Sequence, residues 1–366
     1  MPHLGGIEAY THRIARALVR RGCRVLVVSS NFAGLAARET IDGVEQIRLP
    51  VFRVARNRYP FLKPNKQLRS QLRDLRCEDI DRIIVNTRFH QTSLAGARLG
   101  SSLHVPVYLI EHGAGPLTLG NWFLDAGLSL AEHVTTRLVR GHVTAVYGVS
   151  QAACDHARKR FGLASAGVWP NCVEATNEEA DAHQVDPPVI VYAGRLLPEK
   201  GADVVLAAAR LVRPEYPGLQ LRIAGDGPMG DALRRDTAGE PWVQLLGHID
   251  PGEVARLDQL ATVFVFTPRH PEGLPSGVLE AGVAGCPVVV SPMGGSLADV
   301  VIDGVSGLMV PPEPAAVAGA LRMLLDHPQM RQKLGAGLRA VVTEKFSAEV
   351  VADKMLHDMG LAGGDE

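Results

Sequence analysis

The fold is decided by the stretch Pro271-Glu-Gly-Leu-Pro-Ser-Gly-Val-Leu-Glu-Ala-Gly-Val-Ala-Gly285. Short apolar runs flank it on both sides, at 263–267 and 287–291. Their lengths and the hydrophobic period predict a strand, a glycine-rich loop, a short helix and a second strand. A loop that leaves the carboxyl end of a strand and leads into a helix is where open α/β sheets bind ligands.

Two carboxylates belong to this stretch, with seven residues between them. Glu272 is predicted in the loop and Glu280 about a turn into the helix. The amides at a helix N-terminus favour anions, so acidic residues beside them suggest a ligand that carries both phosphate and many hydroxyls. A nucleotide sugar fits that description. The alternative is a solvated loop glutamate and an unrelated glutamate on a helix face.

Further motifs surround the glutamate pair. A predicted strand at 189–193 leads into Gly194-Arg-Leu-Leu-Pro-Glu-Lys-Gly201, and Gly5-Gly-Ile-Glu8 stands near the start. Other matching segments lie at 221–228, 243–248 and 294–308. Together they resemble the family 4 glycosyltransferases. The resemblance covers roughly residues 5 to 350, is strongest from 189 to 310, and is loose between about 45 and 140.

The resemblance implies a GT-B fold, an α/β architecture of two Rossmann-like doubly wound domains facing across a cleft. Alternating helix and strand patterns in both halves agree with that class. The expected strands of the first half are 24–29, 82–86, 105–110 and 143–147, with helices at 7–21 and 150–161. The expected division is an acceptor-side domain at 1–172, a linker at 173–187, a nucleotide-sugar-binding domain at 188–348, and a final helix at 349–366 that packs back on the first domain.

The family's activity follows as an expectation. The chain resembles a retaining, metal-independent, hexosyltransferase-type enzyme that moves a sugar from a nucleotide-diphosphate sugar to an acceptor hydroxyl in carbohydrate biosynthesis. The nucleotide sugar is a co-substrate, and no cofactor is expected. Two alternatives share the fold: a nucleotide-sugar epimerase, and a non-catalytic nucleotide-sugar-binding protein. An epimerase needs no acceptor, and a binding protein need not keep the four charged residues Arg195, Lys200, Glu272 and Glu280.

Candidate catalytic and donor-binding residues come mostly from the second half. Two cations five positions apart, Arg195 and Lys200, can grip a diphosphate and stabilise it as it leaves; the alternative is a pair of solvated cations. By resemblance, Glu280 holds the ribose hydroxyls and Glu272 lies at the donor sugar. The remaining expected donor contacts are Gly194, Gly225, Gly247, Ile249, Gly273, Leu274, Pro275 and Ser276. Backbone contacts to the base leave uracil and guanine as alternatives.

The first half contributes fewer candidates. Gly5 and Gly6 precede a helix and can offer amides to a phosphate. By resemblance His112 lies near the donor sugar, although a histidine after a strand is more often structural. The acceptor is expected at polar residues that end a neighbouring strand, namely Asn86, Arg88 and His90.

Composition excludes several classes. Hydrophobic residues make up 46% of the 366 residues, and no run reaches the ~18 apolar residues of a spanning helix. The five cysteines have no metal or redox spacing, which favours a reduced, cytoplasmic chain. Asp79 and Asp81 form an Asp-x-Asp, but they enter a strand instead of leaving one, so no metal site is expected. No nucleic-acid-binding motif accompanies the basic residues.

The densest basic stretch is 52–76, which holds eight cations against Asp74 alone, with apolar residues interleaved. One interpretation is a solvated helix face. The other is contact with anionic lipid head groups or with an anionic acceptor, which would make the chain peripheral at the inner face of the membrane.

The chain start departs from the family pattern. Members begin with an apolar strand before the Gly-Gly loop, whereas only Met1-Pro-His-Leu precedes Gly5 here. We expect about 20 upstream residues, since the first strand of a doubly wound sheet is central. Without that strand two interior edges stay unpaired and the first domain is poorly stable.

Overall fold

The computed structural model describes residues 6–54, 59–113, 122–175, 186–270, 273–292 and 295–361. The chain divides into two compact units. Unit 1 is Met1–Pro170 with Val351–Glu366, and unit 2 is Asn171–Val350. The start of the expected linker belongs to unit 2, where Val173 forms a parallel bridge with Ser347.

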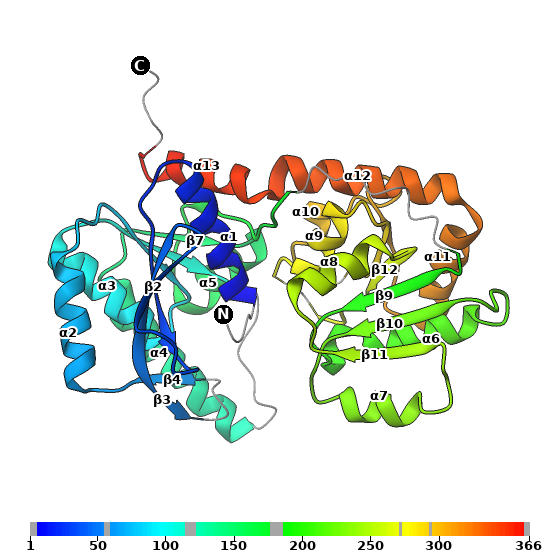
Figure 1. Cartoon of the computed structure of the whole chain (residues 1–366), viewed down its shortest axis with the longest axis horizontal. Helices are drawn as coiled ribbons and strands as arrows, with labels where there is room; N and C mark the ends of the chain where they lie inside the picture. The colour runs from blue at the N-terminus through cyan, green and yellow to red at the C-terminus, as the bar shows by residue number, and fades with distance from the viewer. Residues whose placement is uncertain are drawn as a thin grey trace, which may run out of the picture. The chain divides into compact units, whose positions relative to one another are not determined.

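Unit 2 is built on a six-stranded parallel sheet with the order β11-β10-β9-β12-β13-β14. Figure 1 labels the first four of these strands. The strands are β9 (Val189–Ala193), β10 (Gln220–Ala224), β11 (Val243–Gly247), β12 (Val263–Phe266), β13 (Val288–Val290) and β14 (Leu308–Met309). The helices are α6 (Ala202–Val212), α7 (Gly230–Asp236), α8 (Pro251–Gln259), α9 (Ser276–Val283), α10 (Leu297–Val300), α11 (Pro314–Asp326) and α12 (Pro328–Phe346). Strand order runs outward from β9 in one direction and from β12 in the other, so the topological switch point lies between them.

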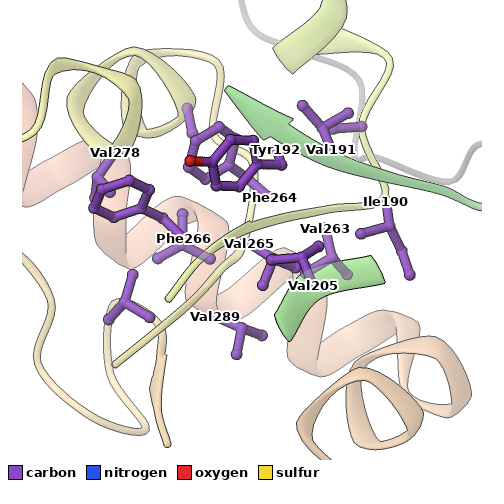
Figure 2. Packing of buried hydrophobic residues seen from close by; sticks show 14 of the residues in the cluster. Ile190, Val191, Tyr192, Val205, Val263, Phe264, Val265, Phe266, Val278 and Val289 are labelled. Atoms are coloured by element: carbon purple, nitrogen blue, oxygen red, sulfur yellow. The ribbon is translucent and has the colours of Figure 1, made fainter. Parts of the chain in front are cut away.

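The two strands at the switch point form the centre of the core. Ile190, Tyr192, Val263 and Phe264 are completely buried, and the side chains of β9 and β12 pack together in Figure 2. Both strands read as continuous apolar runs because helices cover both faces of a parallel sheet. This rigid centre carries the loops that leave its carboxyl edge.

The described residues of unit 1 form two separate sheets of four strands each. The first joins β1 (Leu26–Asn31), β2 (Arg38–Ile41), β3 (Val44–Val54) and β4 (Tyr59–Leu62). The second is parallel and joins β5 (Ile83–Asn86), β6 (Val107–Glu111), β7 (Ala145–Gly148) and β8 (Gly167–Val168). The helices are α1 (Gly6–Arg20), α2 (Lys66–Asp74), α3 (Gln91–Leu103), α4 (Trp122–Arg140), α5 (Gln151–Phe161) and α13 (Ala348–Asp358), of which α13 begins in unit 2.

An open pocket of about 840 Å³ lies in unit 1 and is lined by both sheets. Val28 of β1, Ile84 of β5, Leu18 of α1 and Met355 of α13 contribute to its wall. Across the part of the chain that the structure describes, β1 pairs only with β3 and β5 only with β6. Each of these two strands therefore has one edge without a strand partner.

The antiparallel strands β2, β3 and β4 were not predicted. Asp42 and Gly43 connect β2 to β3 with positive φ angles of 52° and 77°. An Asp-Gly pair with both φ angles positive is typical of a two-residue hairpin turn. Four other strands of unit 1, namely β1, β5, β6 and β7, lie within two residues of their predicted bounds, whereas the short strand β8 was not predicted. None of the described helices is long and apolar enough to cross a membrane.

Candidate active site

The loop after β9 carries the two predicted cations. The Arg195 side chain is exposed, whereas Lys200 is half-buried at the end of a short 3₁₀ turn. Gly201 follows with φ of 78° and caps the N-terminus of α6. A Cβ at Gly201 would lie 2.0 Å from the carbonyl oxygen of Thr267, so the loop is held against the end of β12. Only glycine fits at this position.

The loop after β10 is joined to the β9 loop through the backbone. Leu196 donates its amide to Asp226 at 2.9 Å and accepts one from Met229 at 3.1 Å. Gly225 has φ of 134°, and its Cβ would lie 1.8 Å from the carbonyl oxygen of Gly194. Side chains are excluded there, so main-chain groups line this part of the edge.

The loop after β11 completes the edge. Gly225 donates its amide to the carbonyl of Gly247 at 2.7 Å, and Ile249 is half-buried against the core of unit 2. The structure therefore brings the predicted residues Gly194, Gly225 and Gly247 together at the carboxyl ends of three adjacent strands.

Helix α9 begins at the other side of the switch point. Its N-terminal residue is Ser276, preceded by Pro275, which has no N–H to offer. A Cβ on Gly277 would lie 3.2 Å from the carbonyl oxygen of Ala193, so the first turn of α9 lies directly against the end of β9. Of the predicted loop residues, Gly273 is half-buried and Leu274 is buried.

Glu280 is half-buried on α9. A second acid, Asp258 on α8, interacts with it electrostatically. Asp258 is fully buried, and neither of its carboxylate oxygens has a hydrogen-bond partner. Burial, and then the charge of Glu280, raise the pKa of Asp258 well above its usual value. The raised pKa favours the neutral form of Asp258, which reduces the negative charge on α8 beside Glu280.

Three supporting residues were missed by the sequence analysis. Asn171 donates its Nδ2 to the carbonyl of Leu274 at 2.9 Å and to Ser276 Oγ at 3.0 Å. Arg269 pairs with Asp203 through two hydrogen bonds of 2.9 and 2.6 Å, and its amide bonds to the loop after β9. Neither Asn171 nor the Arg269–Asp203 pair belongs to a recognisable motif, since each acts on a residue distant in sequence.

In unit 1, His112 follows β6 and is coupled to β5. Its Nε2 lies 2.8 Å from Asn86 Oδ1, and its ring makes an edge contact with Tyr10, with centroids 5.1 Å apart. Burial lowers the pKa of His112 to about 3. The imidazole is therefore neutral at physiological pH. Gly6 is exposed at the first position of α1.

Arg88 was predicted to contact the acceptor, and the structure shows that this prediction is wrong. Its side chain is only 2% exposed and forms ion pairs with the buried residues Glu111 and Glu132. Glu111 in turn accepts the amide of Gly113 at 3.0 Å. Arg88 is thus a buried structural cation that pairs with Glu111, the residue that accepts the Gly113 amide directly after β6. His90 is half-buried at the N-cap of α3, and burial lowers its pKa.

Some predictions fall elsewhere. Gly5 and Glu272 lie outside the described residues. Asp79 and Asp81 precede β5, at the strand's amino end. In the described ranges no three His, Cys, Asp or Glu side chains gather in a group that could hold a metal ion.

The basic stretch 52–76 contains both buried and exposed side chains. The leucines of α2 and the turn after it face inward: Leu68 and Leu75 are buried. Phe52 and Phe61 are cross-strand partners on β3 and β4, and they are 48% and 45% exposed. The interleaved leucines therefore serve the core, and the exposed apolar surface is the phenylalanine pair. The described cations of the stretch are exposed, namely Lys63, Lys66, Arg69, Arg73 and Arg76, and Lys63 lies over the ring of Phe52.

Two family models match the chain. The model for glycosyl transferases group 1 matches residues 173–340, and the model for Glycosyltransferase Family 4 matches residues 4–177. Together they account for nearly the whole of both units.

Curated relatives agree with the family models. A glycogen synthase of Mycobacterium tuberculosis is 27% identical, over 95% of this chain and 89% of its own length. An α-D-kanosaminyltransferase of Streptomyces kanamyceticus is 25% identical, over 72% and 70%. A D-inositol 3-phosphate glycosyltransferase of Jonesia denitrificans is 34% identical, over 46% and 42%.

Solved structures share the fold. Anabaena Alr3699/HepE in complex with UDP-glucose superposes with a TM-score of 0.75 at 18% identity, over 98% of this chain and 96% of that one. Sucrose-phosphate synthase of Thermosynechococcus elongatus gives 0.71 at 20% identity, over 98% and 94%. These neighbours confirm the expected GT-B fold. The two family models, which together span residues 4–340, show that the chain belongs to the group 1 and family 4 glycosyltransferases.

Proposed function

We propose that the chain is a retaining glycosyltransferase that uses a UDP-sugar and transfers the sugar to an acceptor hydroxyl without a metal ion. The observation that carries the proposal is the edge of the unit 2 sheet. The loop with Arg195 and Lys200 lies beside the switch point between β9 and β12, and so does the start of α9, the helix that carries Glu280. Cations, helix amides and a carboxylate suit diphosphate, phosphate and ribose respectively.

UDP is chosen over other nucleotides because the fold neighbour Alr3699/HepE was solved with UDP, and with UDP-glucose. The loops after β10 and β11 present main-chain groups, as a base pocket that reads polar edges requires. Gly225 and Gly247 keep that surface free of side chains.

The proposed reaction is a same-face substitution. The bond between the sugar's anomeric carbon and the diphosphate oxygen breaks, the acceptor oxygen bonds to that carbon from the same side, and the acceptor proton passes to the departing phosphate oxygen. Arg195, Lys200 and the α9 amides stabilise the charge that develops on the diphosphate. This role replaces the Lewis-acid work of a divalent cation in metal-dependent enzymes.

His112 is proposed to contact the donor sugar as a neutral hydrogen-bonding group. Its lowered pKa, about 3, excludes an imidazolium near pH 7. It therefore adds no charge to the site, and the positive charge rests on Arg195 and Lys200.

The test is a donor panel of UDP-, GDP- and ADP-sugars, with and without added sugar or alcohol acceptors, followed by mass spectrometry and by NMR of the product's anomeric configuration. An α-linked product from an α-linked UDP-sugar, formed equally in EDTA, is the expected result. Conversion of the donor without an acceptor would identify an epimerase. Binding without turnover would identify a sensor, and loss of activity in EDTA that manganese restores would overturn metal independence.

A further inference from the structure

The hydrogen bonds around His112 form a directed chain that begins in α1. Thr11 Oγ1 lies 2.7 Å from the carbonyl oxygen of Ile7, and Asn86 Nδ2 lies 3.2 Å from Thr11 Oγ1. Asn86 Oδ1 lies 2.8 Å from His112 Nε2. Three side chains from α1, β5 and the loop after β6 are thereby joined.

The direction of this chain follows from counting protons. A carbonyl oxygen can only accept, so the single hydroxyl proton of Thr11 is given to Ile7. The Thr11 oxygen is then left as an acceptor toward Asn86. Asn86 must turn its NH₂ group to Thr11, which places its carbonyl oxygen toward His112. That oxygen cannot donate, so His112 Nε2 must carry the ring proton.

We propose that Thr11 and Asn86 are positioning residues that fix His112 as the Nε2-protonated tautomer, so that Nδ1 presents a lone pair to a hydroxyl of the sugar substrate. The identity of the substrate rests on the proposed function, whereas the tautomer does not. Within the described residues Nδ1 has no hydrogen-bond partner of its own, so it is available to accept. The lowered pKa of His112 agrees, because a neutral ring has one acceptor nitrogen and an imidazolium has none.

The backbone of Asn86 is also held in place by a hydrogen bond. Ser93 Oγ, in the first turn of α3, donates to the Asn86 carbonyl at 2.9 Å. Asn86 was predicted to contact the acceptor. In this inference it instead positions His112 and does not touch the substrate itself. A side chain with both amide groups committed to Thr11 and His112 has little left to offer a second ligand.

The test compares Thr11→Val with Thr11→Ser. Valine keeps the shape of threonine but removes the acceptor that selects the orientation of Asn86, whereas serine keeps the hydroxyl. Two-bond ¹⁵N–¹H spectra of ¹⁵N-histidine-labelled protein report which ring nitrogen is protonated, and His112→Gln identifies the resonances. Wild type and Thr11→Ser should show Nε2–H alone between about pH 5 and 8, the range in which an unperturbed imidazole changes charge. Thr11→Val should show a mixture of tautomers.

Kinetics separate this inference from the proposed function. Thr11→Val should lower kcat/KM for transfer about threefold to tenfold, the equivalent of one neutral hydrogen bond, and Thr11→Ser should match wild type. Protonation of Nδ1 in wild type, or an unchanged single tautomer in Thr11→Val, overturns the inference and leaves the proposed function intact. A wild-type Nε2–H signal that mixes in Thr11→Val, in a protein without transferase activity, supports the relay and counts against the proposed function.

Discussion

The Nδ2 atom of Asn171 lies 2.9 Å from the carbonyl oxygen of Leu274, 103 positions further along the chain. This bond ties the first residue of unit 2 to the loop that leads into α9. The Asn171 side chain is buried, and its Oδ1 accepts the amide of Cys172 at 3.0 Å. The α9 loop is therefore held in place by a donor that only asparagine supplies here.

Asn171→Asp should impair the loop without changing the side chain's size. An aspartate keeps the contact to Cys172 but cannot donate to Leu274, so a buried acceptor loses its partner at a cost of about 1–3 kcal/mol. We expect a raised KM for the nucleotide sugar and a lower Tm, measured by kinetics and calorimetry. The matched control is Asn65→Asp at the N-cap of α2, where asparagine only accepts and aspartate serves equally well. A wild-type KM in Asn171→Asp would contradict the role.

Arg195→Ala and Lys200→Ala should each lower turnover by roughly 100-fold, on the order of 3 kcal/mol of transition-state stabilisation. The reason is the loss of a cation at the departing diphosphate. Arg235→Ala, which removes an exposed cation on α7, is the control and should leave kcat/KM unchanged. Steady-state kinetics at saturating acceptor decide the matter, and wild-type rates in both loop variants would remove these residues from the mechanism.

Glu280→Gln should weaken binding of free UDP, because in the proposed donor complex the change replaces the carboxylate that accepts from the ribose hydroxyls. Glu272→Gln should spare UDP binding and impair transfer, since Glu272 is assigned to the sugar. Isothermal titration calorimetry with UDP measures the first effect and transfer assays the second. Equal losses of UDP affinity in the two variants would contradict the assignment of Glu280 to the ribose and Glu272 to the donor sugar.

The free energy of unfolding should fall as the pH is lowered from the pKa of His112 in the unfolded chain toward its pKa in the folded state. The unfolded chain takes up a proton near the ordinary pKa of 6.5, while the folded state resists protonation down to about 3. Between these values the unfolded state binds more protons, so acid favours unfolding by up to about 1.4 kcal/mol per pH unit. Urea denaturation of wild type and His112→Gln at pH 7, 6 and 5 measures the slope.

The comparison must be between variants, because other histidines act in the same direction. Burial also lowers the pKa values of His90 and His156. His112→Gln should therefore have a shallower pH dependence than wild type, although not a flat one. Parallel slopes in the two proteins would mean that His112 titrates normally.

Peripheral binding to anionic lipid is expected to depend on Phe52 and Phe61 together with the exposed cations of the same stretch. Phe52→Ser with Phe61→Ser should reduce sedimentation with phosphatidylserine vesicles, and so should charge reversal at Arg69 and Arg73. Salt of roughly 0.5 M should abolish the charge-dependent part, as screening shortens to a few ångströms. Leu68→Ala should instead destabilise the protein, since that side chain is buried. Absence of vesicle binding by wild type at low salt would make this stretch an ordinary solvated surface.

The sequence predicted unit 2 well because its signals are local. The strands β9, β12 and β13 are apolar runs, and glycines mark the loops that must approach one another, as Gly201 and Gly225 do. The antiparallel part of unit 1 was missed, although Asp42-Gly43 between two β-rich segments is a local hairpin signal. Attention to that pair would have predicted β2 and β3.

Predictions about the site were less complete, because side-chain partners are distant in sequence. Arg88 stands at the end of a strand, where a ligand contact is a fair expectation, but Glu111 and Glu132 turn it inward. Asn171 and Asp258 gave no motif at all. Their roles depend on which helix or loop packs beside them, and that is settled by the tertiary fold.

The divided sheet of unit 1 bears on how cooperatively that unit unfolds. Strands in one sheet share a ladder of hydrogen bonds and tend to open together, whereas β1 and β5 belong to different sheets among the described residues and both line the open pocket. The β1–β4 sheet can thus open as a partial unit while β5 to β8 stay protected. Amide hydrogen exchange would show this as two classes of protection within one unit, and a ligand that stabilises His112 and its neighbours would slow exchange first in the sheet that contains β5 and β6.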